Sequence, residues 1–371
     1  MNRQIFVALD SFKSSLSSFE ANSAVKVALL EMGVDSCDIT CFPMSDGGEG
    51  FSDVYSSYTN SRKISTKVLS PLGDRIIAYY YISDNNVAII ESAAACGYTL
   101  VPSGKKNPLI LSSFGVGEMI NDAISRGAKK IIIGLGGTST NDGGVGMLQA
   151  LGVKFTTEKK LLQEGEPALL KRIISIDKSS LISINVEIDI CVDTQAFFYG
   201  ENGAVKIYGP QKGLQKDCLN DADEWMRELW HMYYPDNQMI SGSGAAGGIA
   251  GALSLLPNSH IKSGASEILS ISKFKELCNN EETQPSLVIT GEGKFDSQTL
   301  TGKLPYIIAQ SCRGAKKVCV AGKVDNHTQN HPFDYISQIT PNDIPLEVAI
   351  QKDVAVKNLK RAILSLPQDY I

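Results

Sequence analysis

Short apolar runs alternate with helical apolar stripes at the start of the chain. Residues 5–9 are uniformly apolar and end at Asp10, which is typical of a strand buried on both faces. A capping-box pattern at residues 17–20 then opens an amphipathic stretch that Gly33 ends, and this predicts a helix. Residues 38–42 form a second apolar run. Strand, helix and strand at this spacing predict a parallel sheet.

The middle of the chain has a different pattern. Two strand-like runs at residues 76–82 and 87–90 flank a short polar turn, which predicts an antiparallel hairpin. Beyond the hairpin the periodicity predicts helices at 115–126, 143–151 and 217–233 and buried strands at 131–135 and 187–192.

The final third returns to the alternation of the opening. Residues 287–290 and 318–321 predict two more buried strands, and a long amphipathic pattern over 346–366 predicts one helix after Pro345. We therefore expect two α/β domains. Residues 1–66 and 275–371 would form a discontinuous domain with a parallel sheet, and residues 67–274 would be inserted into it.

Composition and charge narrow the class of protein. The chain has 371 residues, more than one core usually serves, and 35 Lys and Arg against 40 Asp and Glu give a net charge of −5. This balance provides no basic field for nucleic acid or an anionic membrane. We find no secretory signal pattern and no apolar span, and we interpret the eight cysteines as reduced thiols of a cytoplasmic protein.

Glycine is concentrated in four short segments, most of which follow an apolar run. They are residues 46–50, 134–146, 242–251 and 291–293. At the carboxyl ends of parallel strands, such loops bring backbone N–H groups close to bound oxyanions. Tight turns and close packing are the alternative explanation for any one of these loops.

Acidic and basic side chains lie in or beside the glycine segments. The acids are Asp10, Asp46, Glu49, Asp142, Asp193, Glu292 and Asp296, and the lysines are Lys13, Lys212, Lys294, Lys303 and Lys323. Any single carboxylate here could be a helix cap. As a set they suit Mg²⁺, which takes one or two carboxylates together with phosphate oxygens. Phosphoryl transfer needs positioning and charge neutralisation, so the pattern predicts a small-molecule kinase.

Other motifs fit less well. Residues 242–247 match G-x-G-x-x-G, but the preceding residues make a poor strand and no acid follows at the distance that an NAD site requires. The chain has no G-x-x-x-x-G-K-[ST] phosphate loop, no protein-kinase motif set and no G-x-S-x-G elbow.

The ordered set of motifs resembles the type-1 glycerate kinases along the whole chain. The matching segments are residues 10–13, 43–50, 91–94, 107–108, 136–144, 209–213, 242–251, 290–299 and 302–303. The family usually has glycine where Ser14 stands and arginine where Lys294 stands. The resemblance implies a flavodoxin-like domain, a second domain likened to restriction endonucleases, and an active site between them. It also implies ATP-dependent, Mg²⁺-assisted phosphorylation of D-glycerate, with 2-phosphoglycerate as product and 3-phosphoglycerate as the alternative.

We assign roles to individual residues as hypotheses. Lys13 and Lys294 would hold the glycerate carboxylate or the transferring phosphoryl group, and Asp193 would deprotonate the substrate hydroxyl. Glu292 and Asp296 are second choices for the acidic roles. The predicted metal ligands are Asp46 and Asp142. The predicted phosphate-binding residues are Gly136, Gly137, Gly244, Gly247, Gly248 and Lys303.

Three alternatives stay open at this stage. The protein could phosphorylate another small hydroxy acid, or it could bind glycerate or ATP without turnover. A dehydrogenase built on residues 242–247 is the third. We expect small-molecule partners only, and a homodimer is one assembly to test.

Overall fold

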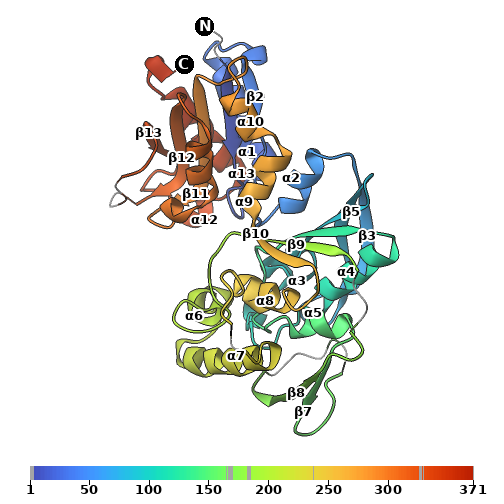
Figure 1. The fold of residues 1–371 in the computed structure, drawn as a ribbon. Helices are drawn as coiled ribbons and strands as arrows, with labels where there is room; N and C mark the ends of the chain where they lie inside the picture. Colours follow the sequence, from blue (N-terminus) through green and yellow to red (C-terminus); the bar gives the residue numbers. More distant parts are fainter. Residues whose placement is uncertain are drawn as a thin grey trace. The chain divides into compact units, whose positions relative to one another are not determined.

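The chain divides into two compact units. The computed structural model describes residues 4–163, 165, 170–181, 185–236, 238–325, 328 and 330–370. Unit 1 comprises Met1–Tyr58 and Ala265–Ile371, and unit 2 comprises Thr59–Gly264. Figure 1 follows the chain through both units. The domain boundaries expected from the sequence, after residues 66 and 274, remain a prediction. Among the described residues no helix combines the length and apolarity that a bilayer crossing requires.

Unit 1 is built on a five-stranded sheet in the order β13-β12-β11-β1-β2, and every neighbouring pair is parallel. Its strands are β1 (Ile5–Leu9), β2 (Ile39–Cys41), β11 (Leu287–Phe295), β12 (Lys316–Val324) and β13 (Tyr335–Gln338). Numbered along unit 1 alone, this is the order 2-1-3-4-5 of flavodoxin-like folds. The order reverses between β1 and β11. Ligands of such sheets bind at the carboxyl ends of the strands that flank the reversal.

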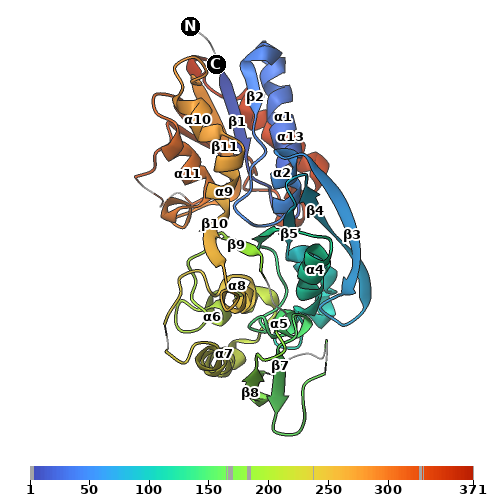
Figure 2. The same ribbon diagram turned by 45° about the vertical axis from the view of Figure 1, so that its right-hand side comes forward.

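Helices cover the sheet of unit 1. They are α1 (Ser18–Glu31), α2 (Phe51–Ser57), α9 (Gly264–Ile271), α10 (Phe274–Asn279), α11 (Leu304–Ser311), α12 (Leu346–Ala349) and α13 (Lys352–Leu364). α1 and α13 lie side by side, as Figure 2 shows, and their apolar faces share a core cluster with β1, β11 and β12. All five residues of β1 are buried, which confirms the strand that the apolar run predicted.

Unit 2 contains a mixed six-stranded sheet in the order β10-β9-β6-β5-β4-β3. Its strands are β3 (Ser61–Leu69), β4 (Arg75–Ser83), β5 (Val87–Glu91), β6 (Lys130–Gly134), β9 (Glu187–Val192) and β10 (Ser259–Ser263). β3, β4 and β5 pair antiparallel, so the predicted hairpin is confirmed. β5, β6, β9 and β10 pair in parallel, which brings the loops after β5, β6 and β9 to one edge.

The remaining elements of unit 2 surround that sheet. The helices are α3 (Ala93–Cys96), α4 (Phe114–Ser125), α5 (Val145–Ala150), α6 (Ala204–Tyr208), α7 (Leu219–Tyr233) and α8 (Ile249–Leu253). A separate antiparallel ribbon joins β7 (Lys154–Thr157) and β8 (Ile173–Asp177). One apolar cluster links the sheet to α4, α5, α7 and α8, with Trp230 fully buried in it. The rigid core therefore lies directly beneath the loops that end β6 and β9.

The prediction of a single C-terminal helix over residues 346–366 is wrong. The structure has two helices there, α12 and α13, which break at Ile350 and Gln351. Leu346 is 73% exposed and Val348 is 40% exposed, so the apolar stripe does not continue onto the core through α12. The periodicity counted these residues as buried because sequence alone does not show which apolar positions face solvent.

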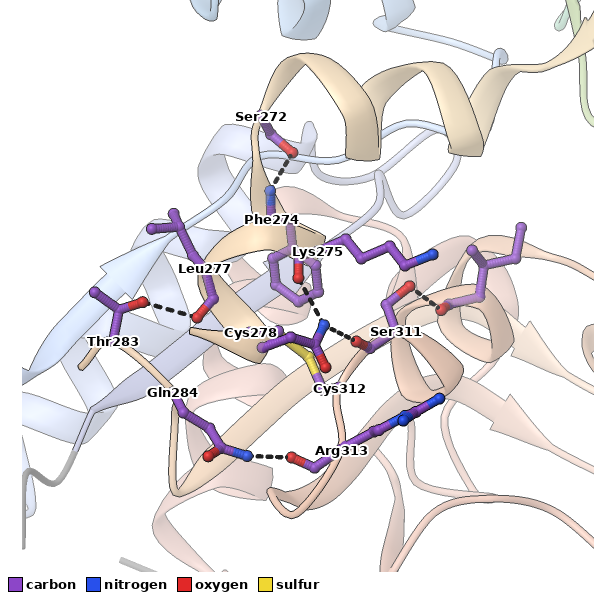
Figure 3. The surroundings of a disulfide bond; sticks show 12 residues. Ser272, Phe274, Lys275, Leu277, Cys278, Thr283, Gln284, Ser311, Cys312 and Arg313 are labelled. Carbon is purple, nitrogen blue, oxygen red and sulfur yellow. Dashed lines mark hydrogen bonds between the residues drawn. A yellow bond between two sulfur atoms is a disulfide. The ribbon is translucent and has the colours of Figure 1, made fainter. Parts of the chain in front are cut away.

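The prediction that all cysteines are reduced is also wrong for one pair. Cys278 on α10 and Cys312 at the end of α11 form a disulfide, as Figure 3 shows. The other six cysteines are free. Beside the disulfide, the Asn279 side chain donates to the Ser311 carbonyl, and the Gln284 side chain donates to the Arg313 carbonyl. Packing of α10 against the end of α11 joins cysteines 34 residues apart, which no local pattern indicates.

We expect the disulfide to contribute to the stability of unit 1. Closing a loop of this length reduces the entropy of the unfolded chain and stabilises the fold by about 4 kcal/mol on the chain-entropy model. Protein purified without reductant should therefore show six reactive thiols in denaturant. Cys312→Ala should lower the melting temperature, whereas Cys37→Ala, at an exposed free cysteine, should not. Eight reactive thiols in the wild type would show that the bond does not form.

Candidate active site

Two aspartates lie at the carboxyl end of the central strands of unit 1. Asp10 follows β1 directly, and its N–H donates to the Gly291 carbonyl of β11 at 3.4 Å. The segment after β2 continues along β1, because Met44 N–H donates to the Leu9 carbonyl at 3.2 Å. Asp46 comes two residues later. The reversal of strand order therefore brings Asp10, Asp46 and the end of β11 to the same edge.

Ser18 fixes this edge from the first turn of α1. Its hydroxyl donates to the Leu9 carbonyl at 2.7 Å and accepts from Met44 N–H at 2.7 Å. The Asn22 side chain also donates to the Leu9 carbonyl, at 3.1 Å. All these groups are buried, so the two loops that carry Asp10 and Asp46 are held by one hydrogen-bonded network.

β11 supplies a second group of charges at this edge. Glu292 is 8% exposed, and its Oε1 accepts a hydrogen bond from the Thr299 hydroxyl at 2.6 Å. The Lys303 ammonium lies 3.7 Å from Glu292 Oε2 and 3.7 Å from Asp296 Oδ1. Lys294, whose side chain is 60% exposed, pairs with Asp296 at 3.0 Å. Two carboxylates and two lysines thus form one connected network.

The ionisation of these acids shows how closely they approach one another. Burial and then the charge of Asp46 raise the pKa of Asp10 well above its usual value. Burial raises the pKa of Glu292 to about 7, with a smaller contribution from the charges of Asp296 and Asp46. Burial also acts on Asp296, but the hydrogen bond from Lys294 and the charge of Lys303 outweigh it and lower the pKa. Asp10, Asp46 and Glu292 therefore repel one another in a partly desolvated site.

Lys13 lies in a tight turn that follows Asp10. Phe12 and Leu16 close the turn by backbone hydrogen bonds, and Ser14 within it has a φ of 61°. The left-handed conformation at Ser14 explains why glycine is usual there in the family that the sequence resembles. Lys13 is exposed, and its charge acts on Asp10.

Asp142, a predicted metal ligand, lies in unit 2 and is fully buried. Its Oδ2 accepts hydrogen bonds from the Ser113 hydroxyl at 2.7 Å, Ser113 N–H at 2.8 Å and Gly146 N–H at 3.1 Å. Its Oδ1 accepts from Gly144 N–H at 3.1 Å. These bonds tie the start of α5 to the start of α4. The geometry gives this carboxylate a structural role, and metal binding by Asp142 remains only a prediction.

The glycines of the 242–251 segment are explained by close packing. A Cβ at Gly244 would lie 2.0 Å from the Phe197 carbonyl oxygen, and one at Gly247 would lie 2.0 Å from the Thr140 carbonyl oxygen. A Cβ at Gly248 would lie 2.8 Å from Gly143 Cα. All three glycines are buried, and their backbone lies against the loop after β6. Phosphate binding by these glycines stays a prediction, because close packing alone accounts for glycine at these positions.

The loop after β6 opens to solvent at one residue. Gly136 is buried, whereas Gly137 is exposed and has a φ of 68°. Beneath the loop, the Lys212 ammonium donates to the Thr140 carbonyl at 2.8 Å, and it lies 3.3 Å from Thr138 Oγ1. Burial lowers the pKa of Lys212 to about 8. Asp193, the predicted base, is exposed and directly follows β9 at the same edge of this sheet.

Comparisons with known proteins identify the family of this chain. The model of the glycerate kinase family matches residues 5–368. A glycerate kinase of Bacillus subtilis strain 168 is 35% identical over 363 residues, covering 94% of this chain and 93% of the relative. The glycerate 2-kinase of Escherichia coli K12 is 34% identical over 371 residues, covering 97% and 96% of the two chains.

The chain belongs to the glycerate kinase family. A solved structure from Salmonella typhimurium LT2, assigned as glycerate kinase 2, superposes with a TM-score of 0.75 at 31% identity. The superposition covers 98% of this chain and 96% of the Salmonella chain. The α/β fold expected from the sequence is confirmed, and the protein is a kinase, that is, a phosphotransferase.

For this glycerate kinase family member, sequence reasoning named most of the unit 1 cluster. Asp46, Glu292, Asp296, Lys294 and Lys303 were all selected because they lie in or beside glycine segments. Asp10 was noted but given no role, and Thr299 was missed. The signal for Asp10 was available, because it ends the first buried strand. Thr299 had no such signal, since its bond to Glu292 depends on the turn after β11.

We predict that Glu292 destabilises the fold at neutral and alkaline pH. Its pKa of about 7 lies above the ordinary 4.5, so stability falls as pH rises from 4.5 to 7 and is then level. The loss in the free energy of unfolding is about 3 kcal/mol at most. Glu292→Gln, which keeps an oxygen for Thr299, should melt at a higher temperature than wild type at pH 8, and the difference should shrink toward pH 5.

The exposed Glu281 provides the control for this measurement. Glu281→Gln should leave the difference from wild type nearly constant between pH 5 and pH 8. A Glu292→Gln protein whose melting temperature differs from wild type by the same amount at both pH values would contradict the prediction.

Proposed function

We propose that the protein transfers the γ-phosphoryl group of ATP to a hydroxyl of D-glycerate and releases 2-phosphoglycerate. Membership of the glycerate kinase family supports glycerate as acceptor. The name glycerate 2-kinase of the Escherichia coli relative supports the 2-phospho product. 3-Phosphoglycerate is the alternative product.

The observation that carries the proposal is the cluster at the carboxyl edge of unit 1. Three mutually repelling carboxylates, Asp10, Asp46 and Glu292, lie with Lys13 and Lys303 where a flavodoxin-like sheet binds its ligand. A structural ion-pair network would match each carboxylate with a cation. Here Glu292 has Lys303 as its cation, but the charges of Asp46 and Glu292 still act on buried Asp10, and this repulsion favours a site that binds a cation and a phosphoryl group.

The residues of unit 1 fit Mg²⁺. Asp10 and Asp46 would hold it, because a divalent cation would offset the burial and the charge of Asp46 that together raise the pKa of Asp10. Among the described residues no group of three or more His, Cys, Asp or Glu side chains is arranged to hold a metal. Mg²⁺ does not need such a cage, since it takes one or two carboxylates and completes its shell with phosphate and water. Bound Mg²⁺ would neutralise charge on the phosphate oxygens.

The side chains of unit 1 also provide for the phosphoryl group itself. Lys13 and Lys294 are exposed at the cluster and can each donate to phosphoryl oxygens or to the carboxylate of the acceptor. Lys303 lies 3.7 Å from each of two carboxylates, which place its ammonium between Glu292 and Asp296. Phosphoryl transfer depends on such positioning and charge neutralisation more than on covalent chemistry.

The direct test is incubation with ATP, Mg²⁺ and D-glycerate, followed by phosphorus NMR of the product. We expect ADP and 2-phosphoglycerate in equal amounts. If ADP forms with another hydroxy acid in a substrate panel and not with D-glycerate, that acid and not D-glycerate is the acceptor. Calorimetric binding of glycerate without turnover would support a silent binding protein. A cytoplasmic location and a homodimer also remain predictions, and size-exclusion chromatography with light scattering would determine the oligomeric state.

A further inference from the structure

Lys212 in unit 2 is a buried cation that makes no direct ion pair with a carboxylate. It ends the short 3-10 helix Pro210–Lys212 and is 7% exposed. Its ammonium hydrogen-bonds to Thr138 Oγ1, the Thr140 carbonyl and Asn141 Oδ1, at 3.3, 2.8 and 3.3 Å. All three acceptors are neutral. Within the part of the chain that the structure describes, no carboxylate lies within ion-pair distance of it, and the charge of buried Asp142 acts on it from farther away.

A buried charged group in the sheet of unit 2 shows the usual arrangement. Asp189 on β9 is fully buried, and the ammonium groups of Lys130 and Lys262 lie 2.6 and 2.7 Å from its two oxygens. That buried charge is compensated by opposite charge. A buried ammonium without a direct ion pair costs several kcal/mol, which hydrogen bonds to neutral oxygens and a more distant carboxylate offset only in part. The cost at Lys212 therefore calls for an explanation other than stability.

Two more buried donors lie beside Lys212. The Asn141 side-chain N–H₂ group has no hydrogen-bond partner among the described residues, and the Thr140 hydroxyl has only the Cys96 thiol beside it. The Asn141 N–H₂ group belongs to the same amide whose oxygen contacts Lys212, and Thr140 contacts Lys212 through its carbonyl. Buried polar groups are nearly always paired, so the unpaired Asn141 donor beside a cation and a hydroxyl indicates a missing acceptor. The acceptor that such a set fits is an oxyanion.

Close packing at two glycines holds the backbone around these donors, and solvent reaches the neighbouring loop at one residue. Gly213 has a φ of 98°, and a Cβ there would lie 2.5 Å from the Lys106 carbonyl, so the turn that places Lys212 is fixed. On the other side Gly247 packs against Thr140 and Asn141. Gly137 is the one exposed residue of the buried run 134–146 and adjoins Thr138. The donors thus lie at the carboxyl end of β6, where solvent reaches the loop at Gly137.

We propose that Lys212, Thr140 and Asn141 form an oxyanion-binding subsite of this kinase. The subsite takes either the carboxylate of the acceptor or a phosphoryl group of the donor, which share this chemistry. The identity of that anion rests on the proposed function, whereas the existence of the subsite does not.

Two variants test the subsite, with Lys216→Met as the control. Lys212→Met removes the cation and keeps much of the side chain's volume, and Asn141→Asp supplies an internal carboxylate to pair with Lys212. Lys216 is exposed and four residues further along. If the subsite exists, both variants should keep or raise the melting temperature of the ligand-free protein, because Lys212→Met removes the buried cation and Asn141→Asp supplies a carboxylate that pairs with it. Both should lose affinity for one oxyanion by about tenfold or more.

Binding is measured by calorimetry with inorganic phosphate, D-glycerate and ATP, and KM is measured for the two substrates. A higher KM for D-glycerate alone assigns the carboxylate to the subsite, and a higher KM for ATP alone assigns a phosphoryl group. If the wild type does not phosphorylate D-glycerate, the proposed function fails, but calorimetry still tests the subsite. Unchanged affinity of Lys212→Met and Asn141→Asp for all three anions overturns the inference. If Lys212→Met does not fold, Asn141→Asp alone decides.

Discussion

Asp46→Asn is expected to reduce kcat by at least about a hundredfold while the protein stays folded. Asp46 is half-buried, and beyond the hydrogen bond from Gly48 N–H at 3.0 Å it is available to hold Mg²⁺ with Asp10. An asparagine keeps the shape and can still accept from Gly48. It removes the charge, so the concentration of Mg²⁺ that gives half-maximal activity should also rise. Steady-state kinetics over a Mg²⁺ titration measures both effects.

Asp53→Asn is the matched control for Asp46→Asn. Asp53 is exposed in the first turn of α2, the helix that follows the same loop. Its replacement should leave kcat and the Mg²⁺ requirement within about twofold of wild type. Asp46→Asn should also not lower the melting temperature of metal-free protein, because it removes a charge that repels Asp10. Wild-type turnover in Asp46→Asn at low Mg²⁺ would exclude Asp46 from metal binding.

The sequence predicted best those features that depend on neighbouring residues. The capping box at Ser17 and Glu20 is confirmed, since the Ser17 hydroxyl accepts from Glu20 N–H and the Glu20 carboxylate accepts from Ser17 N–H. The strands predicted from the apolar runs at β1 and β9 are also confirmed. A run of buried apolar residues has few local alternatives to a strand in a parallel sheet.

The repeated Asp-Gly-Gly-x-Gly pattern shows where local reasoning stops. Asp46 and Asp142 each accept a hydrogen bond from the N–H two residues later, and in each case a helix follows. The sequence gives no basis for separating them. Ser113, which lies 29 residues before Asp142, donates twice to its carboxylate and ties it into the fold. Asp46 instead faces the charges of Asp10 and Glu292.

Glycine segments were ambiguous for a similar reason. Gly244 and Gly247 satisfy the same pattern whether they approach a phosphate or another backbone segment. Their contacts with Phe197 and Thr140 come from distant parts of the chain, so only the folded structure identifies them as packing. The disulfide of unit 1 and the Lys212 cluster depend on long-range contacts in the same way. Local patterns thus predicted the elements, and tertiary contacts determined the roles of the loops.

Asp193→Asn is the second variant with a large expected effect. Asp193 is exposed, directly follows the buried strand β9, and adjoins Thr194, whose hydroxyl contacts the Tyr208 hydroxyl at 2.6 Å. If Asp193 accepts the proton of the acceptor hydroxyl, its loss should lower kcat by about a hundredfold or more, with little change in the KM for glycerate. Asp193→Glu keeps a carboxylate and should retain more activity than the asparagine variant.

The same assay distinguishes Asp193 from its rivals in unit 1. Glu292→Gln and Asp296→Asn remove the second-choice carboxylates, and Asp221→Asn on the exposed face of α7 is the control. A general base acts on the chemical step, so its removal should lower kcat at every Mg²⁺ concentration. A residue that orders the phosphate site through Lys303 should instead raise the KM for ATP. Near-normal kcat in Asp193→Asn, together with a large loss in Glu292→Gln, would transfer the role of base to Glu292.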